Sequence, residues 1–186
     1  MNYFRVALAA MFGVLLQSNL MAADIDTSAE FAYVTDFASG KVLMDKDPDS
    51  PMKPASMAKI MTIYVAFQRI ADGSLSLDDT FLISEKAWRK GGSKTFVEVG
   101  KQVAVRDLLM GVVVQSGNDA AIAIAEGISG TESGFAEEMN YVARQLGMTN
   151  TVFKNATGWP DRDQVTTARD LNILATALIR DFPPQD

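Results

Sequence analysis

Ser56 and Lys59 stand three residues apart at the start of a long apolar segment, within the sequence PASMAK of residues 54–59. In a helix this spacing corresponds to about 300° of rotation and about 4.5 Å of rise, so both side chains share one face. A serine hydroxyl becomes a nucleophile when a neighbouring base removes its proton. Lys59 can be that base only if burial or a nearby positive charge lowers its pKa from about 10.4 toward about 7 to 8. Backbone N–H groups at the start of the helix would favour a developing oxyanion.

The S-x-x-K spacing alone is weak evidence, because an N-cap serine followed by a solvated lysine gives the same pattern. The chain contains its own control, since Ser50 and Lys53 have the same spacing. Pro51 and Pro54 prevent a regular helix from running on from Ser50, so this second pair is not expected on a buried turn. The pair at 56 and 59 is therefore the stronger candidate.

A second candidate group lies in the sequence QSGND of residues 115–119, between two apolar segments. Taken alone, it is an ordinary helix–loop–helix turn in which Gly117 ends one helix and Asn118 or Asp119 caps the next. Beside a serine–lysine pair, residues of this turn could take part in catalysis and substrate binding. The Ser116 hydroxyl can pass a proton between the lysine and a leaving amine, and the Asn118 amide can donate to and accept from a substrate peptide.

Composition restricts the remaining chemistry. The 186 residues include no His and no Cys, which excludes serine–histidine triads, cysteine nucleophiles, disulfides and the metal or haem sites that need imidazole or thiolate. With 17 Lys and Arg against 23 Asp and Glu, the net charge of −6 argues against nucleic acid as the main partner. A hydrophobic content of 48% is typical of a packed globular protein. No metal and no cofactor are expected.

Hydrophobic periodicity predicts one hairpin followed by a mostly helical chain. Strand-like runs at 31–36 and 41–44 flank a turn containing Gly40, and such a hairpin needs further strands or a helical layer beside it. Residues 57–72 are apolar on nearly every face, so we expect a buried helix that ends near Gly73 and starts deep inside the protein. Further helices are expected over 84–90, 105–115, 119–128, 133–146 and 168–180, and a short strand over 151–154.

Residues 1–23 differ in character from the rest of the chain. Arg5 is followed by an apolar, acid-free stretch at 6–16 and then by small residues before Asp24. This pattern predicts a secretory signal peptide, and an uncleaved anchor is the alternative. The apolar stretch is shorter than the roughly 18 residues that a membrane span needs. We therefore expect an exported protein in which residues 24–186 belong to one domain.

Together the motifs resemble those of the low-molecular-weight penicillin-binding serine D-Ala-D-Ala carboxypeptidases, relatives of the class A β-lactamases. Residues 54–59 look like the S-x-x-K motif of that family, and 116–118 look like its second motif with glycine in the middle. The resemblance runs from about 32 to 183. It implies an α/β (α+β) fold of the β-lactamase/transpeptidase type, here a helical subdomain with the first β-hairpin of an antiparallel sheet.

The resemblance also implies an activity. Ser56 would attack the carbonyl between the terminal D-alanines of a peptidoglycan stem peptide, with Lys59 as general base. Ser116 would relay the proton to the departing D-Ala, and Asn118 would hold the substrate amide. Water would then release the acyl-enzyme, and β-lactams would acylate the same serine as inhibitors. The implied location is the periplasm or the outer face of the cytoplasmic membrane, with membrane contact only through parts outside these residues.

One departure from the family pattern is large. The third motif, K-T-G, follows the second motif on a strand, and no K-T-G follows Ser116 here. Lys94 and Thr95 precede Ser116 and are followed by Phe96 instead of the glycine that lets a substrate approach a strand edge. We expect the chain to be truncated before its K-T-G motif, to lack the remaining strands of the sheet, and to be at best feebly active.

Three alternatives remain at this point. A class A β-lactamase needs a glutamate after the second motif, and no Glu follows Glu138. A DD-endopeptidase or a transpeptidase shares the acylation step and differs in the bond cut or in the acceptor. A catalytically silent peptidoglycan-binding protein would explain the missing K-T-G.

Overall fold

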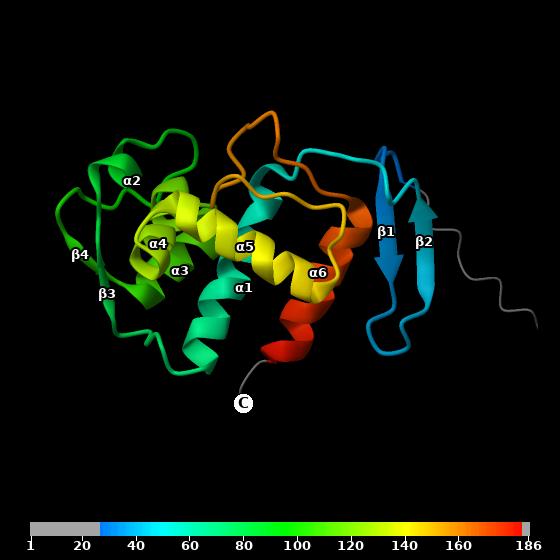
Figure 1. Ribbon diagram of the computed structural model, residues 1–186, viewed down its shortest axis with the longest axis horizontal. Helices are drawn as coiled ribbons and strands as arrows, with labels where there is room; N and C mark the ends of the chain where they lie inside the picture. Colours follow the sequence, from blue (N-terminus) through cyan, green and yellow to red (C-terminus); the bar gives the residue numbers. More distant parts are fainter. Residues whose placement is uncertain (1–26, 184–186) are drawn as a thin grey trace, which may run out of the picture.

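The computed structural model describes residues 27–183, so the predicted signal peptide at 1–23 lies outside the described residues. Helices and short strands alternate along this part of the chain (Figure 1). In order they are β1 (Ala32–Thr35), β2 (Val42–Lys46), the 3₁₀ turn η1 (Ala55–Met57), α1 (Ala58–Ala71), β3 (Thr80–Leu82), α2 (Glu85–Arg89), β4 (Gln102–Ala104), α3 (Val105–Gln115), α4 (Asn118–Ser129), α5 (Glu132–Leu146) and α6 (Ala168–Asp181).

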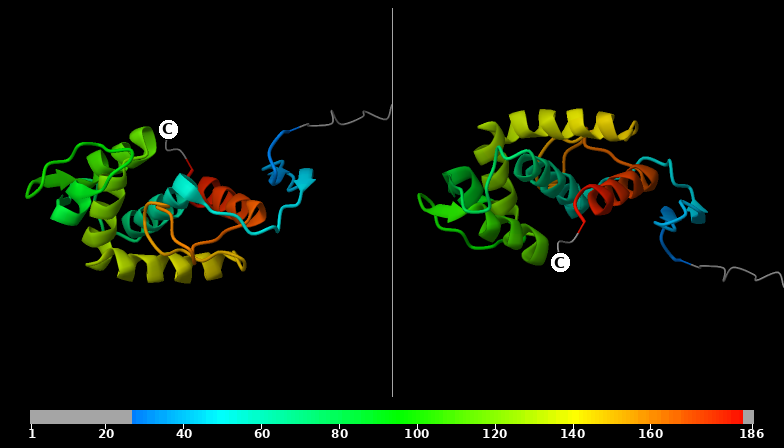
Figure 2. Two further views of the ribbon diagram at one scale, coloured as in Figure 1. Left: turned by 90° about the horizontal axis from the view of Figure 1, so that it is seen from above. Right: turned by 90° about the horizontal axis from the view of Figure 1, so that it is seen from below.

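Helix α1 is the centre of the arrangement, with α3, α4, α5 and α6 packed around it. The antiparallel hairpin β1–β2 lies at one end of the molecule beside α6, and the antiparallel pair β3–β4 lies at the opposite end (Figures 1 and 2). The structure is therefore a helical unit with one small sheet at each end. No helix within residues 27–183 has the length and apolarity needed to cross a membrane.

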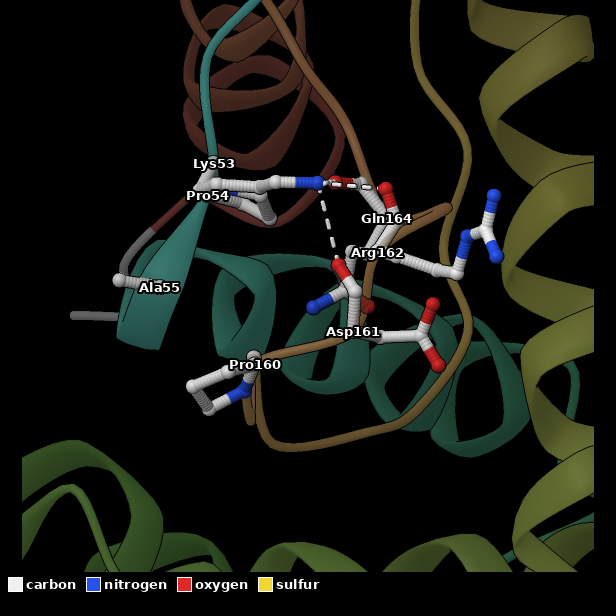
Figure 3. Close-up of a pocket in the computed structure, with 8 residues that line it drawn as sticks. Lys53, Pro54, Ala55, Pro160, Asp161, Arg162 and Gln164 are labelled. Carbon is white, nitrogen blue, oxygen red and sulfur yellow. Dashed lines mark hydrogen bonds between the residues drawn. The ribbon is translucent and has the colours of Figure 1, made fainter.

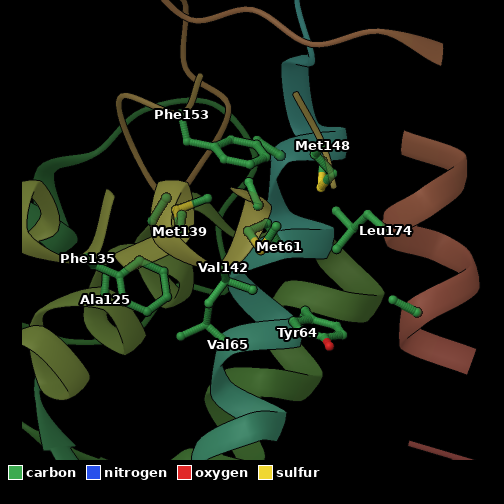
Figure 4. Packing of buried hydrophobic residues seen from close by; sticks show 14 residues of the cluster. Met61, Tyr64, Val65, Ala125, Phe135, Met139, Val142, Met148, Phe153 and Leu174 are labelled. Carbon is green, nitrogen blue, oxygen red and sulfur yellow. The ribbon is translucent and has the colours of Figure 1, made fainter. Parts of the chain in front are cut away.

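Two apolar clusters meet on opposite faces of α1, which explains why that helix is apolar nearly all round. The first cluster packs Met61 and Val65 of α1 against Phe135 of α5 and Leu174 of α6 (Figure 4). The second packs Ala66 and other residues of α1 against α3 and α4. The expectation of a buried helix over 57–72 is confirmed, although the α-helical geometry begins at Ala58 after one 3₁₀ turn.

The predicted helix boundaries agree closely with the structure, and the predicted hairpin is present. Helix α3 spans the expected residues 105–115. Thr167 and Asp170 have the spacing of a capping box at the start of α6, and only half of that box is formed. Thr167 Oγ1 accepts from the Asp170 N–H at 3.1 Å, but the Asp170 carboxylate accepts from Asn150 N and Thr151 Oγ1 instead. Asp170 therefore ties the start of α6 to the segment that follows α5.

Two strand predictions need correction. The pair β3–β4 was not expected, because each strand has only three residues and gives little alternation to detect. The strand expected over 151–154 is reduced to an isolated bridge between Val152 and Val165. The Asn140 side chain bonds both the N–H and the C=O of Phe153 at 2.8 Å, so a side chain occupies the place of a partner strand.

The hairpin is attached to α6 by polar and stacking contacts. The Arg169 guanidinium forms a two-pronged pair with Asp49 and lies 4.4 Å from the centre of the Tyr33 ring. Thr35 Oγ1 and the Asn172 side chain lie within hydrogen-bond distance at 3.2 Å. These contacts fix the hairpin on the outer face of α6, as the expected fold requires.

Leu174 offers a test of the first cluster, because it is fully buried whereas Ile179 on the same helix is 53% exposed. We expect Leu174→Ala to lower the free energy of unfolding by about 2 to 5 kcal/mol, since it removes buried methyl groups and leaves a cavity. The matched Ile179→Ala should change it by less than about 0.5 kcal/mol. Urea unfolding followed by circular dichroism measures both, and equal losses would contradict this assignment of the core.

Candidate active site

Ser56 and Lys59 lie side by side at the start of α1. Ser56 stands in the 3₁₀ turn η1, where side chains three residues apart eclipse one another, and its Oγ lies 3.3 Å from Lys59 Nζ. The two side chains differ in exposure: Ser56 is exposed, whereas Lys59 is only 3% exposed. The expectation that the helix starts deep inside the protein is therefore wrong for the serine. The serine hydroxyl is open to solvent and the lysine amine is buried behind it.

Burial lowers the pKa of Lys59 from 10.5 to about 8. The Nζ atom donates a hydrogen bond of 2.8 Å to the backbone carbonyl of Thr157, which together with Ser56 fixes the direction of the amine. At a pKa of about 8, roughly a tenth of the amine is neutral at pH 7. A neutral amine beside the hydroxyl can accept its proton, which is the condition set by the sequence.

The loop that carries Thr157 approaches the serine turn at backbone contact distance. A Cβ atom added to Gly158 would lie 1.6 Å from the carbonyl oxygen of Ala55. Gly158 has φ +78°, and Ala55 itself has φ +47°, in the left-handed region that residues with a Cβ rarely adopt. A strained residue next to Ser56 and a glycine opposite it together allow the close approach.

Side chains within and beneath the 155–159 loop determine its shape. Asn155 Oδ1 accepts from Thr157 N at 3.2 Å and from Trp159 N at 3.0 Å, which closes the loop on itself. The buried Glu132 accepts from Ala156 N at 3.2 Å through one carboxylate oxygen and pairs with Lys86 Nζ at 2.7 Å through the other. The loop is thus connected to α5 and, through the ion pair, to α2.

The second predicted motif, residues 116–118, contacts backbone groups other than those around Lys59. Ser116 ends α3 in the left-handed conformation with φ +53° and is half-buried. Within residues 27–183 its hydroxyl bonds to no side chain, so the structure does not join Ser116 directly to Lys59. Asn118 is 7% exposed and its Nδ2 donates to the Gly91 carbonyl at 2.8 Å. That bond fixes the amide plane.

Asp119 organises the loop in front of α4. Its carboxylate is fully buried and accepts from the backbone N–H groups of Thr95 at 2.8 Å and Phe96 at 2.9 Å. Phe96 has φ +63° and is 81% exposed. The segment Lys94-Thr95-Phe96 is therefore a loop pinned by Asp119 and not a strand, in agreement with the expectation that it does not replace the third motif.

Trp159 connects the two halves of the site. Lys90 Nζ lies 4.0 Å from the centre of its ring. A Cβ added to Gly92 would lie 3.2 Å from Trp159 Cζ3 and 2.8 Å from Asn118 Nδ2, so the indole and the amide lie close together. Trp159 is 42% exposed and so lies at the border of this surface.

The arrangement thus places an exposed hydroxyl, a buried amine with a lowered pKa, and an oriented amide around one surface. These groups suit attack on a carbonyl with proton transfer through the amine. The described residues bring Ser56, Lys59 and the 155–159 loop into direct contact, and Asn118 joins them through Gly92 and Trp159.

Comparison with known proteins agrees with this geometry. Residues 17–186 match peptidase family S11, D-alanyl-D-alanine carboxypeptidase. D-alanyl-D-alanine carboxypeptidase DacC of Escherichia coli is 42% identical over 156 residues, which cover 81% of this chain and 39% of the relative. The chain belongs to the D-alanyl-D-alanine carboxypeptidase family.

Solved structures show the same fold. D-alanyl-D-alanine carboxypeptidase DacD of Francisella tularensis superposes with a TM-score of 0.85 at 43% identity, over 87% of this chain and 39% of that one. Penicillin binding protein 5 of Haemophilus influenzae gives a TM-score of 0.82 at 39% identity, over 86% of this chain and 47% of that one. The mixed α/β fold of the β-lactamase/transpeptidase type is confirmed. The chain spans about two fifths of the length of the curated relative it matches.

Several positioning groups were not found from the sequence. The Lys59 partner at Thr157 is a backbone carbonyl, which no side-chain pattern reveals. Gly158 gave only a weak indication of its role in the site. A glycine before Trp159-Pro160 predicts a turn but does not predict a contact with the turn that holds Ser56. Asp119 and Glu132 stand at the first turns of helices, where acidic residues are expected for helix stability alone.

Gly158→Ala tests the close approach of the loop. We expect the added Cβ to push the loop away from Ala55, to admit water to Lys59, and to raise its pKa from about 8 toward 10.5. A ¹³C NMR titration of the lysine side-chain carbons measures the change. The control is Gly73→Ala, which has the same backbone conformation at φ +77° but nothing within 4 Å of the added atom. A Lys59 pKa that moves equally in both variants, or in neither, would show that the contact does not matter.

Proposed function

We propose that this protein removes the terminal D-alanine from peptidoglycan stem peptides through an acyl-enzyme on Ser56. The observation that carries the proposal is the exposed Ser56 hydroxyl lying 3.3 Å from the buried amine of Lys59. Membership of the carboxypeptidase family supports the choice of substrate.

The proposed reaction gives each group of the site a role in acylation. Neutral Lys59 takes the hydroxyl proton as Ser56 Oγ attacks the carbonyl carbon of the penultimate D-alanine. The C–N bond to the last D-alanine then breaks, and its nitrogen receives a proton that Ser116 passes on from Lys59. Asn118 holds the amide of the peptide meanwhile. Water attacks the resulting ester, which restores the hydroxyl and releases the shortened peptide.

The proposal extends to inhibition and location. β-Lactams would acylate Ser56 in place of the dipeptide, and the name of the Haemophilus influenzae relative supports this. The substrate lies outside the cytoplasm, so the protein would act in the periplasm or at the outer face of the membrane. The composition of residues 1–23 supports export.

Labelled penicillin tests the acylation step. Using the longest product that the reading frame encodes, we expect a covalent adduct on Ser56 that is lost in Ser56→Ala and retained in Ser50→Ala, the serine of the second S-x-x-K. An adduct that survives Ser56→Ala would refute the assignment of the nucleophile. Complete absence of an adduct in the folded wild type would favour a silent peptidoglycan-binding protein.

The products formed distinguish a carboxypeptidase from enzymes that share the acylation step. Release of free D-alanine from a stem pentapeptide is the expected result. Cleavage of a cross-linked dimer without D-alanine release would indicate an endopeptidase, transfer to an added amine would indicate a transpeptidase, and rapid turnover of penicillin itself would indicate a β-lactamase. Mass spectrometry separates these products.

The lowered pKa of Lys59 predicts the pH dependence of acylation. Since the neutral amine is the base, the rate should rise about tenfold per pH unit at low pH and level off above about 8. Unfolding restores the ordinary value of 10.5, so the unfolded chain binds more protons between about 8 and 10.5 and the folded state gains stability as pH rises through that window. Lys59→Met should remove both effects. A rate that is flat between pH 6 and 9 would contradict Lys59 as the base.

A further inference from the structure

Lys53, the lysine of the second S-x-x-K pair, reaches across to the loop beyond Trp159. Its Nζ donates hydrogen bonds to three backbone carbonyls, those of Asp161 at 3.1 Å, Arg162 at 2.7 Å and Gln164 at 2.8 Å (Figure 3). These acceptors lie more than a hundred positions further along the chain. One side chain three residues before the nucleophile therefore gathers a whole turn of the loop.

The contact bridges an opening in the structure. A pocket of about 390 Å³ lies between the segment before Ser56 and this turn, lined by Pro54, Ala55, Gly158 and Pro160 among others. Side chains are therefore not packed across this gap. Three contacts hold the two segments together here: the backbone approach of Gly158 to Ala55, the bonds of Lys53, and a backbone bridge between Met52 and Thr166.

Gln164 carries the constraint from the turn to the loop beside Lys59. Its side chain is 2% exposed, and its Oε1 accepts from Lys154 N at 3.0 Å and Asn155 N at 3.3 Å. Its Nε2 donates to the Trp159 carbonyl at 3.3 Å. Lys53 holds the backbone of Gln164, and the side chain of Gln164 holds both ends of the segment that contains Thr157.

We infer that Lys53 is a positioning residue for the general base: it fixes the 155–164 loop so that the Thr157 carbonyl meets Lys59 and water stays out. The inference rests on the proposed function, because it takes Lys59 to be the base of acylation. In the second S-x-x-K pair, only the lysine has this positioning role. Ser50 has no part in it.

The effect passes through the loop and not through charge repulsion. Burial lowers the pKa of Lys59. Releasing the loop would hydrate the amine and raise its pKa toward 10.5. A complete return to that value would leave about 300-fold less neutral amine at pH 7.

The test compares Lys53→Met, Lys53→Gln and Lys53→Arg with the wild type. For each, labelling of Ser56 by penicillin is followed from pH 6 to 10. We expect the midpoint to rise by about one pH unit in Lys53→Met, which corresponds to about tenfold slower labelling at pH 7. Lys53→Arg keeps several N–H donors and should stay near the wild type, while Lys53→Gln should lie between. Lys101→Met, a change at another exposed lysine, is the matched control.

The outcomes separate the two proposals. An unchanged midpoint in Lys53→Met, or in Lys53→Gln if the first variant does not fold, would overturn the positioning role even if the melting temperature falls. A midpoint that also shifts in Lys101→Met would overturn it as well. Absence of labelling in the wild type would instead count against the proposed function. In that case the Lys59 titration by ¹³C NMR still decides the role of Lys53.

Discussion

The structure of the site depends on one hydrogen bond, from the buried amine of Lys59 to the backbone carbonyl of Thr157. A lysine can be kept from water only if other groups surround it, and here a loop from nearly a hundred residues further on supplies them. That loop reaches the amine because position 158 lacks a Cβ and because Ala55 adopts a strained conformation. Gly158, the strained Ala55 and the Thr157 carbonyl therefore satisfy one constraint: the chain must close over the Lys59 amine without covering Ser56.

The start of α1 and its body serve different purposes, because Lys59 is covered by the loop while Ser56 stays exposed. Its body forms both apolar clusters, which fixes the helix in place, and its first turn presents Ser56 to solvent. Burying a lysine costs stability at neutral pH, because the charged form is disfavoured in the interior. Packing on both faces of α1 offsets that cost. The same helix therefore supplies the rigidity and carries the destabilising buried amine that the proposed reaction needs.

The sequence predicted the helices and the Ser56–Lys59 pair because both depend on local spacing. Apolar periodicity placed α3 correctly at both ends, and an i, i+3 pair needs only one helical turn to meet. The missed features depend on backbone groups brought together from distant segments. Thr157 acts through a carbonyl, the Asn140 side chain takes the place of a strand beside residues 151–154, and Lys53 bonds carbonyls that no motif records. Periodicity reports which side chains face inward but not which backbone atoms they meet.

The two S-x-x-K pairs have the same spacing but different surroundings, and the backbone around each lysine determines its role. Around Lys53, three carbonyl oxygens take up all three N–H bonds of an ammonium, so its nitrogen has no lone pair to offer. Around Lys59, one carbonyl and one serine hydroxyl lie within hydrogen-bond distance, which leaves room for a neutral amine to donate to the first and accept from the second. The prolines before position 55 keep the first pair extended, and the helix that follows brings the second pair together. Identical spacing therefore yields a structural clamp in one case and a candidate base in the other, and the difference lies in the number of oxygens that surround each nitrogen.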